Sequence, residues 1–442
     1  MDRVKEALPD SAGRADADFT SLAASVLARC DVLAKCSDQR GQTTRTFLSP
    51  AMEKCHRLAG EWMQAAGFSA NVDRVGNLRG YYVASSESEN GRAVPRLLIG
   101  SHLDTVPNAG RYDGVLGVML GIALVEALHG KRLGFGIEVI GFSDEEGVRY
   151  GLPFIGSRAA TGTLLAPHLA RRDASGIAMY SALNAFQEAH SDVIDARLVP
   201  QTQAYLEFHI EQGPVLEHAG LALGVVETIA GQSRATVTFH GKSGHAGTTP
   251  MFLRRDALAA AAEWLVKIES AAASMPGLVA TTGRISCEGG AANVIPGTVS
   301  CSLDVRHPDD AVRRAAVQDF LATADAIGRR REIEVGHVVE YEQAAVGLDA
   351  GLIALADRAV SSAGVSSRHM TSGAGHDAMI MAEHIPAGMI FLRSPGGISH
   401  HPDETVYAQD VAAALRAGMK FLDAFEGYLR QLSESEQKSC TN

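Results

Sequence analysis

The sequence has few cysteines and no long apolar segment. Its six cysteines form no CxxC pair and no regular spacing, which argues against a disulfide framework and a structural zinc ribbon: Cys30, Cys36, Cys55, Cys287, Cys301 and Cys440. No stretch approaches the roughly 18 consecutive apolar residues of a membrane span, and residues 1–20 lack the apolar core of a secretion signal. We therefore expect a protein of the reducing cytoplasm.

The chain also lacks an excess of positive charge. It carries 40 basic and 51 acidic side chains, a formal net charge of −11, which argues against nucleic acids and anionic membranes as partners and favours small solutes. With 46% hydrophobic and 21% charged residues, its composition is typical of a globular protein. Its 442 residues exceed the roughly 250–300 at which one core stops growing, so we expect two domains.

Most of the chain alternates short β-type runs with helical ones. Residues 19–66 have helical periodicity interrupted by a polar loop at 36–50, and strands are predicted at 95–100, 136–142 and 204–210, with an apolar helix at 114–128. A helix at 352–364 and a strand at 387–394 resume this order later in the chain. The alternation predicts an α/β domain with a mixed, largely parallel sheet and helices on both faces.

The region between residues 225 and 342 has a different order, βαββαβ. Its strands are predicted at 233–240, 277–286, 297–306 and 332–341, and its helices at 254–269 and 309–327. This is the order of a ferredoxin-like α+β unit. We predict a discontinuous catalytic domain of residues 1–224 and 343–442, an inserted domain of residues 225–342, and a disordered tail at 433–442.

Potential ligands follow the ends of separate predicted strands: His102, the pair Glu145 and Glu146, His209, and His400. In open α/β sheets functional groups gather at the carboxyl ends of the strands, so these segments should meet. Taken singly the signals are weak, because an adjacent glutamate pair is usually a solvated surface feature and a loop histidine is often only a hydrogen-bonding group. Together they favour a metal site.

The segment "GSHLDTVPNAGRYDG" adds two carboxylates. Asp104, two residues after His102 on the same face of an extended chain, suits the orientation of that imidazole. Asp113 precedes the apolar helix, where a carboxylate can bridge two cations. Nitrogen and oxygen ligands without thiolates suit Zn, Mn, Co or Ni, and one cation would leave too many acids uncompensated. Glu146 would then bind metal and Glu145 would act as general base, which contributes about 10²–10⁴-fold in rate.

Eight motifs together resemble the amidase, hydantoinase/carbamoylase family of the binuclear metallopeptidase-like superfamily, over residues 46–425. They are "GSHLDTVPNAGRYDG", "FSDEEGVRYG", "HIEQGPVLE", "GHAGTTPM", "NVIPG", "DVRH", "SGAGHDA" and "GGISHHPDE". The resemblance implies Glu145 as the base and two divalent ions per subunit, Mn²⁺ before Zn²⁺, Co²⁺ or Ni²⁺. The implied ligands are His102, Asp113 and His209 for one ion and Asp113, Glu146 and His400 for the other.

The resemblance also implies roles for polar residues outside the metal ligands. His245 would stabilise the oxyanion, and Asp104 would assist catalysis. A guanidinium can clamp a carboxylate with two parallel N–H bonds, which suits Arg306. The expected substrate-binding set is Gln212, Asn293, Arg306, Ser372 and Gly373.

Assembly follows from the same resemblance. Members of the family are homodimers that pair through the inserted domain, which predicts that His245, Asn293 and Arg306 enter the active site of the neighbouring subunit. The inserted domain would also serve as a lid that closes on the core, with hinges near Val225 and Glu342, because such closure completes a site and excludes water.

The implied reaction is hydrolysis of a ureido or carbamoyl C–N bond in a small carboxylate. The segments around Asp113 and Glu145 resemble allantoate amidohydrolases most, since carbamoylases and β-ureidopropionases more often have Asn where this chain has Asp144. We therefore expect allantoate as substrate, with ureidoglycine, ammonia and carbon dioxide as products. The alternatives are an N-carbamoyl-L-amino-acid hydrolase, a ureidoglycolate hydrolase or a β-ureidopropionase. A di-zinc exopeptidase is disfavoured because His209 stands where those enzymes usually have an acid, and a metal-free binding protein because every expected ligand is present.

Overall fold

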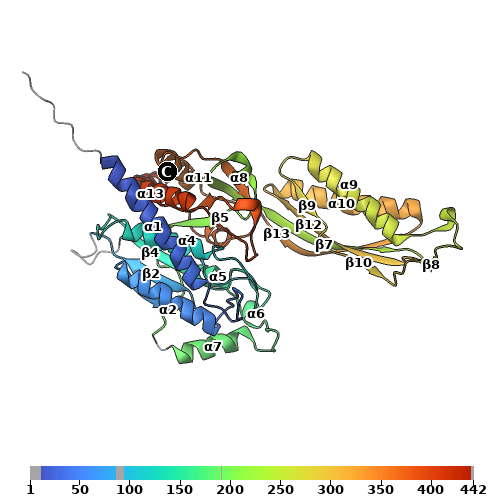
Figure 1. Cartoon of the computed structure of the whole chain (residues 1–442), viewed down its shortest axis with the longest axis horizontal. Coiled ribbons are helices and arrows are strands. Elements are labelled where there is room, and N and C mark those ends of the chain that lie inside the picture. Colours follow the sequence, from blue (N-terminus) through green and yellow to red (C-terminus); the bar gives the residue numbers. More distant parts are fainter. Residues whose placement is uncertain (1–10, 86–93, 191, 440–442) are drawn as a thin grey trace, which may run out of the picture. The chain divides into compact units, whose positions relative to one another are not determined.

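The computed structural model describes residues 11–85, 94–190 and 192–439. It divides into two compact units (Figure 1). The first comprises Met1–Glu227, Leu348–Met370 and His376–Asn442, and the second comprises Thr228–Gly347 and Thr371–Gly375. Each unit has its own hydrophobic core.

A mixed sheet organises the first unit, with the strand order β1-β2-β4-β3-β5-β16-β6-β14 and β15 paired with β6. Strand β14 and the last two residues of β6 and of β15 fall within the bounds of the second unit. The four central strands are parallel, and the outer pairings are antiparallel. The bounds are β1 Ser69–Val72, β2 Leu78–Tyr82, β3 Arg96–His102, β4 Gly136–Phe142, β5 Thr202–Ile210, β6 Leu223–Ile229, β14 Val346–Gly347, β15 His369–Ser372 and β16 Ala387–Leu392. The predicted α/β fold with a mostly parallel sheet is confirmed.

Helices cover both faces of this sheet. Helix α4 (Val115–Glu126) is apolar on all sides and buried from Val115 to Val125, because β3, β4 and β5 pack against one side of it and α1 (Ser11–Leu33) and α13 (Ala408–Ser439) against another. Leu206 and Phe208 of β5 join this core. Neighbouring residues of a strand point to opposite faces. Glu207 therefore lies on the other face, where α12 (Asp377–Ala382) packs and Ala378 donates its N–H to the Glu207 carboxylate.

The remaining helices of the first unit are short or peripheral. They are α2 Pro50–Ala65, α5 Ile155–Thr161, α6 Ala166–Leu169, α7 Met179–Ala189, α8 Val215–Ala219, α11 Ala350–Ser362 and the 3-10 turn η2 Pro395–Gly397. The two N-terminal helices and the loop between them are confirmed. Helix α13 continues to Ser439, so the predicted disorder is wrong for residues 433–439, and residues 440–442 lie outside the described residues. Because propagation is easier than nucleation, a helix that is anchored in the core can extend beyond it.

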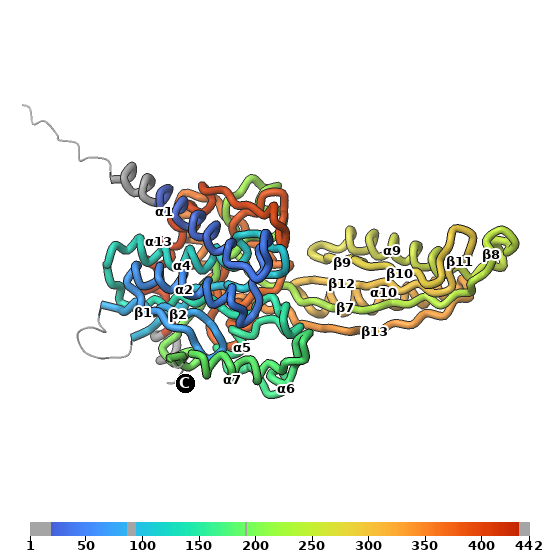
Figure 2. Tube along the Cα trace, turned by 60° about the horizontal axis from the view of Figure 1, so that its bottom comes forward, coloured from blue at the N-terminus to red at the C-terminus, as the bar shows by residue number. Residues whose placement is uncertain are grey.

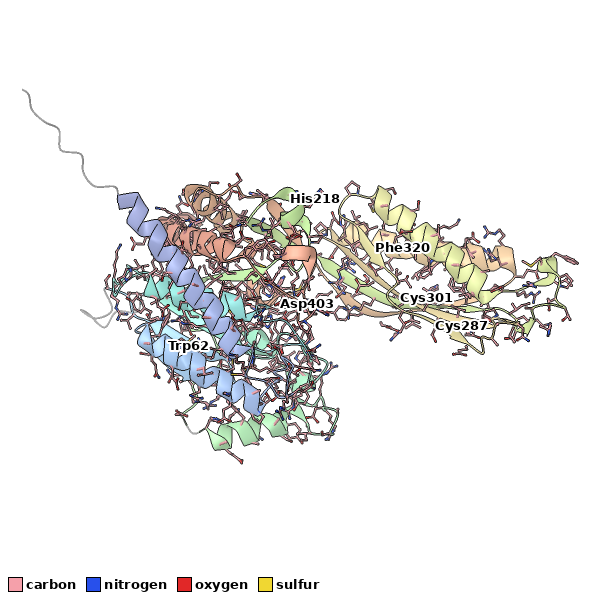
Figure 3. All side chains as sticks on the ribbon, in the orientation of Figure 1. Trp62, His218, Cys287, Cys301, Phe320 and Asp403 are labelled. Carbon is pink, nitrogen blue, oxygen red and sulfur yellow. The ribbon has the colours of Figure 1, made fainter. Side chains whose placement is uncertain are left out.

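An antiparallel five-stranded sheet forms the second unit, in the order β10-β12-β7-β13, with β9 beside β12. The bounds are β7 Gly231–His240, β9 Val279–Thr281, β10 Ile285–Glu288, β12 Thr298–His307, β13 Glu334–Gln343, α9 Ala257–Ser274 and α10 Asp310–Arg331. The two helices bury one face of the sheet, where Trp264 and Phe320 pack. Cys301 of β12 is buried, whereas Cys287 of β10 is exposed (Figure 3).

One predicted strand of this unit, 277–286, is in fact two. Residues 282–284 stand opposite the two residues 302–303, so one extra residue separates β9 from β10. Ser302 Oγ accepts the N–H of Arg284 at 3.0 Å within this bulge. Gly283 at its centre bears no side chain to pack. An inserted residue shifts the alternation of side chains by one, but all four residues of β10 are exposed, so no apolar–polar alternation marks the shift in the sequence.

A separate two-stranded ribbon lies beyond one end of the five-stranded sheet (Figure 2). It consists of β8 (Gly244–His245) and β11 (Val294–Ile295), and the 3-10 turn η1 (Met251–Leu253) follows β8. In the described part of the chain, every helix is too short or too polar to cross a membrane.

Candidate metal centre

Four segments of the first unit deliver side chains to one place. They are residues 102–113, the glutamate pair 145–146, the end of β5 with His209, and the loop with His400. His102 ends β3, Asp113 precedes α4, Glu145 and Glu146 follow β4, and His209 lies near the end of β5, while His400 lies in the loop after η2. The ligand atoms of His102, Asp113 and His209 lie within 4.8 Å of one another, and so do those of Asp113, Glu146 and His400. The structure thus brings together both sets of ligands that the sequence predicted, with Asp113 common to the two.

Asp113 is the centre of this arrangement. Its Oδ1 lies 3.1 Å from Nε2 of His209 and 3.6 Å from Nε2 of His102. Its Oδ2 lies 3.2 Å from Nε2 of His400, which is also 3.4 Å from Oε1 of Glu146. The two oxygens of one carboxylate therefore face different histidines, as a ligand shared by two cations requires.

The histidine ring orientations are set by the backbone. Nδ1 of His209 lies 2.9 Å from the carbonyl oxygen of Ile210, and Nδ1 of His102 lies 3.1 Å from that of Asp104. A carbonyl only accepts, so each Nδ1 carries the hydrogen, and in the neutral imidazole Nε2 keeps a lone pair directed at Asp113. Among the described residues, Nε2 of His209 and Oδ1 of Asp113 are buried without a hydrogen bond. Two electron-pair donors that face each other at 3.1 Å need a metal ion or a proton between them. Burial lowers the pKa of His209, but contact with Asp113 outweighs it and raises that pKa, so a divalent ion bound here would take the place of a proton on Nε2.

The buried acids around the ligands also favour a site for cations. Apart from the ligands themselves, several further acids are buried next to the histidines and one another, namely Asp104, Asp144, Glu145, Glu207, Asp377 and Glu404. Because burying a charge without a partner is costly, burial raises the pKa of each of these acids, and positive charge beside them would keep them ionised. These residues fit a pair of divalent cations.

The electrostatics of the ligands and the base follow from burial and proximity. Burial raises the pKa of Asp113, but His102, His209 and His400 outweigh it and hold that pKa well below its usual value. Burial raises the pKa of Glu145 well above its usual value; His102 opposes this shift and the charge of Glu146 adds to it. Contact with Asp113, and then with Glu146, raises the pKa of His400 to about 10.

Asp104 holds the glutamate pair in place. Its Oδ1 accepts the N–H of Glu145 and its Oδ2 the N–H of Glu146, both at 3.1 Å. The expected contact to His102 is longer, 3.6 Å from Nδ1 to Oδ1, because the backbone carbonyl of Asp104 is the nearer acceptor at 3.1 Å. The residue before the pair, Asp144, has a positive φ of 53°, which turns the chain sharply after β4.

The predicted substrate residues divide between the two units. In the first unit, Gln212 Nε2 donates to Oδ2 of Asp113 at 3.0 Å. In the second unit, Arg306 donates through Nη1 to the carbonyl of Gly373 at 2.6 Å, and its Nε lies 2.8 Å from Oδ1 of Asp304. The neighbouring Ser372 is buried and donates to the carbonyl of Ala374. Arg306, Ser372 and Gly373 therefore form one group.

His245 and Asn293 form another group, on the ribbon of β8 and β11. Ala246 donates its N–H to the carbonyl of Asn293, and His245 pairs in register with Val294. At one end of β12, Arg306 pairs with Gln232 of β7; the opposite end, Thr298, pairs with His240, the residue of β7 nearest the ribbon. The two groups thus lie at opposite ends of the same sheet, separated by the length of β12.

Known proteins resemble this chain over most of its length. Residues 98–424 match the model of peptidase family M20/M25/M40. The chain belongs to this family. A probable allantoate deiminase of Oryza sativa subsp. japonica is 38% identical over 431 residues, which cover 89% of this chain and 87% of the relative. An N-carbamoyl-L-amino acid amidohydrolase of Geobacillus stearothermophilus is also 38% identical, over 375 residues, 84% of this chain and 90% of the relative.

Solved structures agree with this assignment to family M20/M25/M40. The crystal structure of an amidase of the hydantoinase/carbamoylase family from Burkholderia multivorans is similar with a TM-score of 0.83 and 29% identity, over 90% of this chain and 97% of that chain. The resemblance drawn from the eight sequence motifs is thereby confirmed.

Sequence reasoning missed several buried residues around the ligands of this M20/M25/M40 chain. The rings of His376 and His209 make an edge-to-face contact with centroids 4.4 Å apart. Together with Glu207 they form a further group of potential metal ligands. Burial lowers the pKa of His376 well below its usual value, and His209 adds to the shift. Glu404 contacts the loop of Asp113. His376 and Glu404 lie inside the motifs "SGAGHDA" and "GGISHHPDE". These motifs were the sequence signal from which both residues could have been predicted to lie at the site.

Proposed function

We propose that this protein is a metal-dependent amidohydrolase that cleaves a ureido or carbamoyl C–N bond of a small carboxylate, with allantoate as the substrate and ureidoglycine, ammonia and carbon dioxide as products. The observation that carries the proposal is the pair of ligand groups that share Asp113, with Glu145 beside them. The names of the relatives, allantoate deiminase and N-carbamoyl-L-amino acid amidohydrolase, support the reaction class.

Five side chains would hold two divalent cations, Mn²⁺ before Zn²⁺, Co²⁺ or Ni²⁺: His102, Asp113, Glu146, His209 and His400. Bound there, such ions would polarise the ureido oxygen and favour ionisation of water. Asp104 would keep the two glutamates in position through its bonds to their N–H groups. Glu145 would take the proton from the attacking water and return it to the departing ammonia.

We propose that the second unit corresponds to the inserted ferredoxin-like domain of residues 225–342, which acts as lid and dimerisation domain. Arg306 would clamp the substrate carboxylate, with Ser372 and Gly373 beside it. In the structure its guanidinium is held by Asp304, so binding of a carboxylate would compete with that ion pair.

The distance within the second unit supports a homodimer. Arg306 and Thr298 are eight residues apart on β12, which is about 26 Å at about 3.3 Å per strand residue. His245 and Asn293 lie on the ribbon beyond the Thr298 end. A substrate as small as allantoate cannot bridge that separation, so the three residues would not enter the neighbouring site together, as the sequence had led us to expect. His245 and Asn293 of one subunit would instead complete a site in which the other subunit supplies Arg306.

Overall identity does not separate the candidate substrates, because both named relatives are 38% identical to this chain. Asp144 before the glutamate pair favours allantoate, by resemblance to the allantoate amidohydrolases. The free cysteines of the described residues are compatible with the cytoplasm, where we place the protein.

The test is a substrate panel on the metal-loaded protein. Allantoate, N-carbamoyl-L-methionine, ureidoglycolate and a dipeptide are incubated separately, and ammonia or free amine is measured. We expect the highest kcat/KM with allantoate. Turnover of the carbamoyl amino acid with allantoate inert would replace the substrate but keep the reaction class, and cleavage of the dipeptide alone would overturn the proposal.

A further inference from the structure

Glu404 is a buried acid that the proposed reaction does not use. It lies four residues after His400 and is fully buried. Its Oε1 accepts two backbone N–H groups, from Tyr112 at 2.8 Å and from Asp113 at 3.1 Å. One carboxylate oxygen of the C-terminal loop therefore fixes the backbone of the shared ligand, although 291 positions of sequence separate the two residues.

The same loop also contacts the side chain of Asp113. Ser399 Oγ lies 3.1 Å from Oδ2 of Asp113 and 3.4 Å from Oε2 of Glu404, so its single hydroxyl hydrogen can be donated to either carboxylate. Asp113 is thus held at its backbone by Glu404 and at its side chain by Ser399. His400, the next residue after Ser399, places Nε2 3.2 Å from the same Oδ2.

The loop before Asp113 approaches the Glu404 side chain closely at Gly110. A Cβ atom added to Gly110 would lie 2.3 Å from Oε1 and 2.4 Å from Cβ of Glu404. Glycine at this position is therefore required by the close approach of the Glu404 side chain and not by a positive φ. The contact between Gly110 and Glu404 and the hydrogen bonds of Glu404 join the same two loops, the one before α4 and the one after η2.

We propose that Glu404 is a positioning residue. It would hold Asp113 and His400 in the relative position that two ligands of one metal ion require. It would act through the acceptor geometry of Oε1, since a neutral amide oxygen can accept the same two N–H bonds. The proposal rests on the metal centre of the proposed function, and it concerns a residue outside the ligand set. Partners of metal ligands of this kind typically change metal affinity by about 10–100-fold when they are removed.

The experiment compares Glu404→Ala with Glu404→Gln in the full-length protein. Co²⁺ and Mn²⁺ affinities are measured by competition with a chromophoric chelator, and the visible absorption of the Co²⁺-loaded protein reports the coordination. We expect Glu404→Ala to weaken metal affinity by about 10–100-fold, more for the ion that Asp113 shares with His400 than for the other, and to change the Co²⁺ spectrum. Glu404→Gln, which keeps the acceptor oxygen, should remain close to wild type in both measurements.

A second variant keeps the test decisive if Glu404→Ala does not fold. Gly110→Ala leaves Glu404 in the chain but displaces it, so it should weaken metal binding in the same way. In the double variant Gly110→Ala/Glu404→Ala the two effects should be less than additive, because the clash disappears with the side chain.

Three results would overturn the proposal. They are wild-type metal affinity in a folded Glu404→Ala or Gly110→Ala protein, equal losses in Glu404→Ala and Glu404→Gln, and full additivity in the double variant. Failure of the wild-type protein to bind Co²⁺ or Mn²⁺ would instead overturn the metal centre itself. Metal binding with no hydrolysis of any ureido substrate would count against the proposed reaction and leave the role of Glu404 to be decided by the affinities.

Discussion

Oδ1 of Asp113 lies 3.1 Å from Nε2 of His209, and both atoms are buried without a hydrogen bond within the described residues. Two lone pairs at this distance repel each other unless a metal ion or a proton lies between them. The same carboxylate faces His400 through its other oxygen. Asp113 is therefore the residue on which the proposed two-metal arrangement depends.

Asp113→Asn should abolish the binding of both divalent ions. The amide keeps the shape of the carboxylate but loses its charge and replaces one acceptor oxygen with a donor. Metal content per subunit, measured by mass spectrometry after dialysis against the metal, should fall well below that of wild type. Asp304→Asn, an acid of the second unit, is the control and should leave metal content unchanged. Retention of both ions by Asp113→Asn would contradict the shared-ligand geometry.

Glu145→Gln should separate catalysis from metal binding. The amide cannot accept and return a proton, so ammonia release should fall by about 10²–10⁴-fold while metal content stays at the wild-type level. Glu145 and His102 are 4.0 Å apart at Oε2 and Nε2, so the ligand groups need not move. Undiminished turnover would remove Glu145 from the role of base, and loss of metal would reassign it as a ligand.

Complementation between subunits should reveal whether His245 acts on the neighbouring site. Two inactive variants, Glu145→Gln and His245→Ala, are co-expressed with different tags, and the mixed dimer is purified by both tags in succession. If His245 serves the other subunit, one of the two sites is intact and the dimer should have about half the wild-type activity. Absence of activity in the mixed dimer would show that both residues serve the same subunit. Gel filtration of the wild-type protein tests the dimer independently.

The buried histidine His56 should make folding stability sensitive to mild acid. Burial lowers its pKa from 6.5 to about 3, with Arg45 and His190 adding to the effect. The unfolded chain therefore binds one more proton than the folded protein between these values. This contribution to stability is complete above pH 6.5 and is lost as the pH falls toward about 3, by about 1.4 kcal/mol per unit.

His56→Leu should remove this pH dependence. Urea unfolding at pH 7.5 and pH 5.5 measures it, and the variant should lose less stability than wild type between these two values, by about 1.4 kcal/mol for the unit below 6.5. His218→Leu, at an exposed position on α8, is the matched control and should behave like wild type (Figure 3). Parallel pH profiles for wild type and His56→Leu would refute the prediction.

Two helical glycines should respond to alanine with opposite signs. A Cβ at Gly117 of α4 would lie 2.1 Å from the carbonyl oxygen of Phe208 in β5, so Gly117→Ala must push the helix from the sheet and should cost about 1–3 kcal/mol. Gly427 of α13 has open space around the same position, so Gly427→Ala should stabilise the protein by about 0.5–1 kcal/mol. Unfolding free energies from urea titrations check both values. A Gly117→Ala protein with the same unfolding free energy as wild type would contradict the close packing of α4 on β5.

The sequence pattern located the central elements of both units well, because helical and strand periodicity are local properties. Strand β4 was predicted with the bounds that the structure has, and the apolar run of α4 was recognised to within a few residues. The break between β9 and β10 and the extension of α13 to Ser439 were missed. The break involves a contact with Ser302, which lies elsewhere in the chain, whereas the extension continues the packed body of the same long helix.

By itself the sequence determined which side chains could bind metal, since residue types and the rule that strand ends converge in α/β sheets are readable without coordinates. The tertiary structure decided how these side chains are held. Glu404 fixes Asp113 and Asp104 fixes the glutamate pair through backbone N–H groups, and every residue except proline carries such a group. The residue type of the N–H donor therefore gives no sign of these contacts, which arise only when segments distant in the chain are folded against each other.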